Sequence, residues 1–114
     1  MRNSNGWFCA RGSSSKYPGR PAVIAALQRG EKVSLAFGRD EHDQIVVVNP
    51  DTREVVGCIP PLVYPNDPER EDQYDLLECF IDLRMATPIA VKKSRDNIMI
   101  KVEVVTPEQV VVYA

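Results

Sequence analysis

Two apolar runs separated by a proline-containing turn constrain this chain more than any other feature. Residues 45–48 read IVVV, residues 54–60 read EVVGCIP, and NPDTR links them. β-branched residues favour strands, and Pro50 fixes φ at the second position of a turn. The pattern therefore predicts an antiparallel hairpin. Gly57 predicts a β-bulge or the close approach of another backbone, and Pro60 ends the strand because proline cannot donate to a ladder.

Similar patterns predict the other elements. Pro21 and Pro68 suit the first turn of a helix, and Gly30 suits the end of one. We therefore expect helices over about 20–30 and 67–79. Alternating apolar residues predict the strands, at residues 6–10, 32–38, 81–85, 89–91, 98–104 and 109–113. The predicted fold is mainly β (α+β), a small antiparallel β-barrel of about six strands with two short helices.

The chain of 114 residues has the length of one domain. We expect residues 1–5 to be a flexible N-terminus and residues 6–114 to form the domain. No apolar stretch approaches the roughly 20 residues that span a membrane, and the first residues lack an apolar signal core. We therefore expect a cytoplasmic protein without a membrane partner.

The three cysteines, Cys9, Cys58 and Cys79, are odd in number and far apart in the sequence. This spacing does not match a disulfide framework or a paired metal-binding motif. Cys58 and Cys79 have apolar neighbours, so we expect both to be buried thiols that pack as small hydrophobic residues.

Charge is distributed unevenly along the chain. Residues 1–39 contain seven basic residues and one acidic residue, whereas residues 40–82 contain two basic and twelve acidic residues. The basic third predicts an electropositive patch on a protein whose net charge is -2. Mixing of opposite charges from different segments on the folded surface is equally compatible with these counts.

His42 is the only histidine and lies within the acidic sequence DEHD at residues 40–43. The chain lacks the G-x-S-x-G, P-loop, H-E-x-x-H and G-x-G-x-x-G motifs, so a histidine mechanism would need a partner from a distant segment. A metal bound by Asp40, His42 and Asp43 would need further ligands, and the spacing of a calcium loop is absent. We expect a hydrated loop, with no catalytic residue, metal or cofactor. An enzyme that pairs His42 with a distant Ser, Cys or acid is the third-ranked hypothesis.

The basic third contains the loop ARGSSSKYPGR at residues 10–20, which directly follows a pair of aromatic residues. It interleaves Arg11, Lys16 and Arg20 with Tyr17. Basic and hydroxyl groups bind phosphate oxygens, and an aromatic ring stacks on an unpaired base. This is the composition expected of a platform for single-stranded nucleic acid on a small barrel. In the alternative interpretation the aromatic residues belong to the core or its rim, and the basic residues only keep the surface soluble.

Residues 27–60 resemble the HIRAN domain in the order of their features. A glycine–acid pair at Gly30 leads into V-S-L at 33–35, and a polar loop at 39–44 precedes the apolar strand 45–48. The sequence V-G-C-I-P at 56–60 then ends the similarity. The loop departs from the family because it lacks the usual asparagines, and S-S-K-Y at 14–17 replaces the expected tandem aromatics.

The resemblance implies a small β-barrel that binds single-stranded DNA and captures its 3′ end, without a motor of its own. Carried over by position, Arg11, Lys16 and Tyr17 would contact the strand. Asp43 would meet the terminal hydroxyl, with Asp40 as the other candidate. This function requires Tyr17 and Asp43 to face a common groove.

Two hypotheses for function therefore lead. The first is a non-enzymatic DNA-binding module, specific for single strands or 3′ ends, that uses Arg11, Lys16, Tyr17, Arg20 and Asp43. The alternative is a small protein-interaction module, such as a phage or plasmid regulator. Its acidic segment from Asp67 to Asp82 would bind a host protein by presenting carboxylates in place of phosphates.

Overall fold

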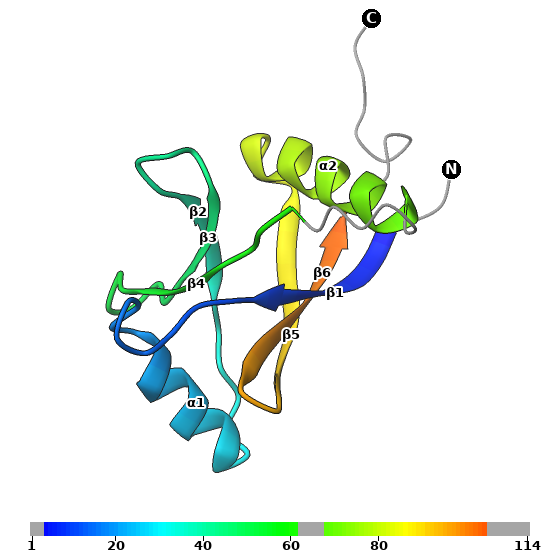
Figure 1. The fold of residues 1–114 in the computed structure, drawn as a ribbon. Coiled ribbons are helices and arrows are strands. Elements are labelled where there is room, and N and C mark those ends of the chain that lie inside the picture. The colour runs from blue at the N-terminus through cyan, green and yellow to red at the C-terminus, as the bar shows by residue number, and fades with distance from the viewer. Residues whose placement is uncertain (1–3, 62–67, 105–114) are drawn as a thin grey trace, which may run out of the picture.

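The computed structural model describes the backbone of residues 4–61 and 68–104 and the side chains of 6–61 and 73–103. The fold is mainly β with two helices, as predicted, and contains two three-stranded antiparallel sheets (Figure 1). The elements in chain order are β1 (Ser4–Ala10), α1 (Arg20–Gln28), β2 (Ala36–Arg39), β3 (Ile45–Val48), β4 (Val55–Cys58), α2 (Pro68–Asp82), β5 (Ala86–Ser94) and β6 (Asn97–Val104).

The first sheet has the strand order β1-β6-β5 and joins the two ends of the described chain, since Ser4 pairs with Val104. The second sheet is the local meander β2-β3-β4. Just beyond β1, Arg11 connects the two sheets. Its N–H donates to the carbonyl of Cys58 at 2.8 Å, and the N–H of Cys58 donates back at 2.9 Å. Figure 1 shows β1 running from the first sheet toward β4.

Gly57 allows this connection, and both parts of its prediction are confirmed. The register shifts beside it, so that Val47 pairs with Gly57 while Val48 pairs with Val55. A Cβ on Gly57 would lie 3.0 Å from the carbonyl oxygen of Arg11. A larger residue would therefore push the end of β1 away from β4.

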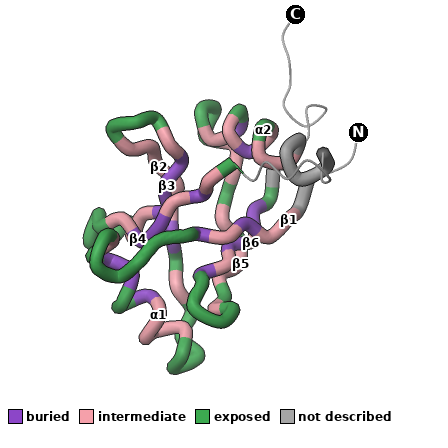
Figure 2. The backbone as a smooth tube through the Cα atoms, viewed as in Figure 1, coloured by how far each residue is buried: buried purple, intermediate pink, exposed green. Residues whose placement is uncertain are grey.

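One apolar core lies between the sheets and helices (Figure 2). Alternate residues of β1, β3 and β6 point into it, as the period of two in a strand requires. The helices contribute Val23 from α1 and Leu77 and Phe80 from α2. The other buried members are Phe8, Ala10, Leu35, Ile45, Val47, Val56, Ile59, Ile98, Ile100 and Val102.

The strand predicted at residues 81–85 is wrong, because α2 continues to Asp82. The helix ends in a turn in which Arg84 adopts a left-handed φ of 58°, and the N–H of Met85 donates to the carbonyl of Phe80 at 2.7 Å. The alternating apolar residues at the helix end resembled a strand, but Leu83 is 57% exposed. β5 begins at Ala86.

The strand predicted over 32–38 is shorter than expected, because residues 31–35 lie outside the ladder and β2 begins at Ala36. Ser4 and Asn5, predicted to be flexible, belong to β1. Cys58 is half-buried and Cys79 is exposed, so neither is the fully buried thiol that we expected. The strand predicted at 109–113 lies outside the described residues. Among those residues, neither helix has the length and apolarity needed to cross a membrane.

Candidate nucleic-acid interface

Arg20 was predicted to contact nucleic acid, but the structure buries its side chain to 2% exposure. Its Nη1 donates to the carbonyls of Ala10 at 2.9 Å and Val56 at 3.3 Å, and its Nη2 donates to the carbonyl of Asp96 at 3.0 Å. These carbonyls satisfy the guanidinium inside the fold. Arg20 is therefore a structural residue and is not available to phosphates at the surface.

The loop between β1 and α1 keeps the other predicted residues near the surface. A turn follows Gly12, in which the N–H groups of Lys16 and Tyr17 both donate to the carbonyl of Ser13, at 3.1 and 2.9 Å. The side chains of Arg11 and Lys16 are exposed, whereas Tyr17 is half-buried. The loop thus presents two cations beside one partly exposed aromatic ring.

The Tyr17 ring contacts its own loop, and its hydroxyl interacts with β4. It lies against Gly12, where an added Cβ would approach ring atoms Cδ2 and Cε2 to 2.1 Å. Lys16 Nζ lies 5.5 Å from the ring centroid, within reach of a cation–π interaction. A hydrogen bond between the Tyr17 hydroxyl and the Cys58 side chain, together with burial, raises the pKa of Tyr17 to about 12. The ring position is therefore set by β4 as well as by its own loop.

Asp40 organises the loop that joins β2 to β3. Its Oδ1 accepts hydrogen bonds from the backbone N–H groups of Gln44 and His42, each at 2.9 Å. These bonds, chiefly that from Gln44, lower the pKa of Asp40. Asp43 follows with a left-handed φ of 62° and a side chain that is 85% exposed. The acidic DEHD sequence is thus an ordered turn.

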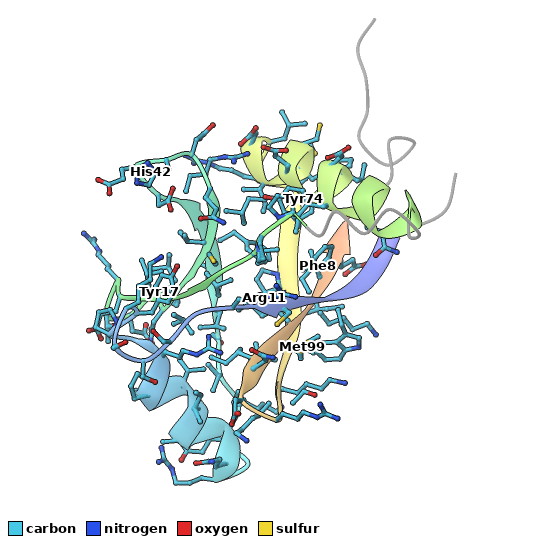
Figure 3. All side chains as sticks on the ribbon, viewed as in Figure 1. Phe8, Arg11, Tyr17, His42, Tyr74 and Met99 are labelled. Carbon is cyan, nitrogen blue, oxygen red and sulfur yellow. The ribbon has the colours of Figure 1, made fainter. Side chains whose placement is uncertain are left out.

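Asp40 also connects this turn electrostatically with the β1–α1 loop. Its negative charge contributes to the raised pKa of Tyr17, and the charge of Lys16 contributes to the lowered pKa of Asp40. Figure 3 places Tyr17 and His42 at the same edge of the molecule. Lys16 and Tyr17 therefore lie together, and Asp40 is near enough for electrostatic interaction with both. Oδ1 of Asp43 instead lies 3.6 Å from Nε of Arg39.

Arg39 is a site residue that sequence reasoning missed. Its side chain is 19% exposed, and Nη2 lies 2.7 Å from Oδ1 of Asp82, while Nη1 lies 3.6 Å from Glu78 and donates to the carbonyl of Asp43 at 2.7 Å. It therefore connects the β2–β3 turn to α2 by pairing with two exposed carboxylates of the predicted acidic segment. A single arginine at the end of a strand has no local signal of this role.

The described side chains place only an exposed carboxylate beside His42. Its ring is 80% exposed, and Nε2 lies 3.5 Å from the carboxylate of Glu41, which is also exposed. Among the side chains of residues 6–61 and 73–103, His, Cys, Asp and Glu do not gather in groups of three or more that could bind a metal.

No protein-family model matches this chain, and neither a curated protein nor a solved structure shows significant similarity to it. The HIRAN resemblance therefore rests on the sequence features of residues 27–60 and stays a prediction.

Proposed function

We propose that this chain is a non-enzymatic, HIRAN-like module that binds single-stranded DNA through the loop from Arg11 to Tyr17. The observation that carries the proposal is the exposure of Arg11 and Lys16 beside the half-buried ring of Tyr17, with Lys16 Nζ 5.5 Å from the ring centroid. Arg11 and Lys16 supply cations for phosphates, and Tyr17 supplies a ring for a base.

The two sheets, in this proposal, form one open barrel. The backbone bonds between Arg11 and Cys58 support continuity on one side, and the contact of β2 with β5 supports it on the other. In small barrels of this kind, loops at one rim bind single strands. The β1–α1 loop and the β2–β3 turn would be two such loops.

Capture of a 3′ end would use a carboxylate that accepts a hydrogen bond from the terminal hydroxyl and repels a terminal phosphate. Asp43 and Asp40 are the two candidates. The Asp43 side chain is 85% exposed and lies 3.6 Å from Arg39, whereas Asp40 is near enough to Tyr17 for its charge to contribute to the raised pKa of that residue. This proximity favours Asp40, while Asp43 shapes the turn through its left-handed backbone.

Fluorescence anisotropy with matched oligonucleotides that end in a 3′-hydroxyl or a 3′-phosphate tests the proposal. Removing the ring with Tyr17→Leu should weaken binding by about 1–3 kcal/mol, the range for stacking on one base. Lys16→Ala should reduce the salt dependence, whereas Arg29→Ala, at the far end of α1, should not. Dissociation constants above about 10⁻⁴ M at low salt for both oligonucleotides would contradict the proposal, since that is weaker than ordinary non-specific binding.

Asp40→Asn separates the two carboxylates, because the amide oxygen can still accept the two backbone hydrogen bonds while the charge is removed. It should reduce the preference for the 3′-hydroxyl more than Asp43→Asn does. Equal affinity of the wild-type chain for both ends would exclude end capture and leave only single-strand binding.

A protein partner is the second candidate, favoured by an exposed stripe on α2. Asp75, Cys79 and Leu83 follow one another at intervals of four residues, which places them on one side of the helix and its end, and all three are exposed. A pull-down from nuclease-treated lysate tests this function. It would be favoured over DNA binding if the wild-type chain captures one specific protein and the Asp75→Lys, Leu83→Asp double variant does not.

A further inference from the structure

The outward face of the sheet β1-β6-β5 carries aromatic and basic residues that the candidate interface does not use. Pairing places Trp7 opposite Lys101 and Lys101 opposite Ala90, so these residues form one row across the three strands. Cys9, Met99 and Lys92 form the next row in the same way. Residues directly opposite each other in an antiparallel sheet face the same side.

The inward-facing neighbours establish which side of the sheet this is. Phe8 and Ile100 pair with each other, and both are buried in the core with Leu77 and Phe80 of α2. Trp7, Met99 and Lys101 are half-buried, and Lys92 is exposed. The rows that contain Trp7 and Lys92 therefore face away from the core.

Trp7 combines a partly exposed indole with two nearby cations. Lys92 Nζ lies 4.2 Å from the indole centroid, a short cation–π distance that spans from β5 across β6 to β1. Lys101 lies directly opposite Trp7 in the register. One aromatic ring flanked by two lysines has the composition of a platform for an unpaired base and its phosphates.

The charge of this sheet differs from that of the whole chain. β5, β6 and the turn between them add four basic and two acidic residues, whereas the acidic residues of the protein are concentrated between positions 40 and 82. Of these residues, Lys92 and Lys101 lie on the outward face together with Glu103, so this face carries a small excess of positive charge on a protein that is acidic overall.

We infer that this face, which we call the sheet platform and define by Trp7, Met99, Lys92 and Lys101, is a second contact surface for single-stranded DNA. A base would stack at Trp7, and Lys92 and Lys101 would neutralise the adjacent phosphates. The identity of the ligand rests on the proposed function, and the sheet platform extends the site beyond the loop that contains Tyr17.

The path of β1 makes one continuous strand of DNA the occupant. β1 carries Trp7 and leads within four residues, about 13 Å, to Arg11, where the loop with Lys16 and Tyr17 begins. Figure 1 shows this run from β1 into the loop before α1. A strand several nucleotides long would contact Tyr17 at one end and Trp7 at the other, within the site sizes of about 4–16 nucleotides known for small barrels.

The test uses Trp7, the only tryptophan of the chain, as its own reporter. The full chain is titrated with oligo-dT of about 4 nucleotides, the lower end of that range of site sizes, and of about 12 nucleotides, well inside it. Quenching of Trp7 emission should follow the anisotropy curve for the longer oligonucleotide, which should bind more tightly than the shorter one. Trp7→Leu should weaken binding of the longer oligonucleotide by about 5- to 150-fold, the effect of one stacked base.

Lys92 and Lys93 supply a matched pair of variants, since they are adjacent on β5 but lie on opposite faces of the sheet. Lys92 pairs with Met99 on the outward face, and Lys93 pairs with the buried Ile98. Lys92→Ala should weaken binding of the longer oligonucleotide. It should also lower the slope of log K against log salt concentration by about 0.7, the value for one phosphate contact on a single strand. Lys93→Ala should do neither. The lysine variants decide the question even if Trp7→Leu does not fold.

The outcomes separate this inference from the function on which it rests. One set of results would overturn the sheet platform alone. In it, binding depends on Tyr17, Trp7 emission is not quenched, and Lys92→Ala and Lys93→Ala change the affinity equally. Binding that depends on Lys92 and not on Tyr17 would support the sheet platform and contradict the role of the loop. Failure of both oligonucleotides to bind would overturn both.

Discussion

Arg20 donates a hydrogen bond of 3.0 Å to the carbonyl of Asp96, a residue 76 positions later in the chain. The same guanidinium reaches the carbonyls of Ala10 at the end of β1 and Val56 in β4. One side chain at the start of α1 thus joins both sheets and the turn between β5 and β6.

Arg20→Ala should therefore destabilise the whole domain. The change leaves three inward-facing carbonyls without this donor and opens a cavity, so we expect a loss of about 3–5 kcal/mol in the free energy of unfolding. Urea denaturation measures the loss. The free energy of unfolding of Arg20→Lys should lie between those of the wild type and Arg20→Ala. The exposed Arg29, which is paired with Glu31, provides the control. Equal midpoints for Arg20→Ala and Arg29→Ala would refute the structural role.

Gly57→Ala should weaken the connection between the sheets. Its Cβ would lie 3.0 Å from the carbonyl oxygen of Arg11 and 3.1 Å from Nη1 of Arg20. Since the first atom belongs to the backbone and the second to a buried side chain, we expect a cost of about 1–3 kcal/mol. Gly38→Ala is the control in β2, because its Cβ would meet nothing closer than 3.5 Å. Thermal unfolding should separate the two variants, and equal stability would contradict the close approach.

Gly12→Ala should displace Tyr17. The new Cβ would overlap the ring at 2.1 Å, and the φ of 146° is a conformation that residues with side chains rarely adopt. The variant should lose the contribution of Tyr17 to DNA binding while the core stays folded. Gly30→Ala shares the positive φ but has open space around it, so it should bind DNA as the wild type does. A fully active Gly12→Ala protein would show that the ring position does not matter.

Tyr17 should ionise near pH 12 instead of its ordinary 10.0. The pKa of Tyr17 in the folded chain exceeds that in the unfolded chain, so the neutral hydroxyl contributes to the stability of the fold. This contribution is complete below pH 10 and is lost as pH rises toward 12. Cys58→Ala removes the hydrogen bond to the hydroxyl and should move the pKa of Tyr17 toward 10. Tyrosinate absorbance measures the change, with Tyr17→Phe subtracting the other tyrosines. An unchanged titration in Cys58→Ala would exclude that bond.

Asp40 should make the fold sensitive to acid. The pKa of Asp40 is lowered in the folded chain, so its carboxylate contributes to stability. This contribution is present above the ordinary pKa of 3.8 and is lost as pH falls through the pKa of the folded state. Asp40→Ala leaves two backbone N–H groups without their acceptor, so its melting temperature should fall. Glu41→Ala, one residue away, should not change it. Melting curves across this acidic range test the claim, which fails if Asp40→Ala and wild type lose stability in parallel.

Local patterns predicted the parts of the fold that local interactions determine. The hairpin from Ile45 to Cys58 follows from its β-branched residues and its turn, and α1 follows from Pro21 and Gly30. The end of α2 did not follow, because backbone bonds of the helix and its final turn outweigh an alternating pattern only five residues long.

The candidate site was only partly predictable. Arg11, Lys16 and Tyr17 share one loop, so their proximity follows from the sequence. The burial of Arg20 and the network of Arg39 depend on carbonyls and carboxylates more than 35 positions away, which no short pattern can reveal. The relation between Tyr17 and Cys58 likewise exists only after β1 has joined β4.

The pairing of β1 with β6, the first and last of the described strands, has a consequence for how the chain is made. β1 leaves the ribosome first, but β6, its main partner, follows almost the whole chain later, after about 5–20 s at ordinary rates of translation. Throughout that interval the apolar sequence from Trp7 to Ala10 lacks this partner. The strand that closes the fold thus stays without its partner for most of synthesis, and its apolar residues are a segment that a chaperone could protect.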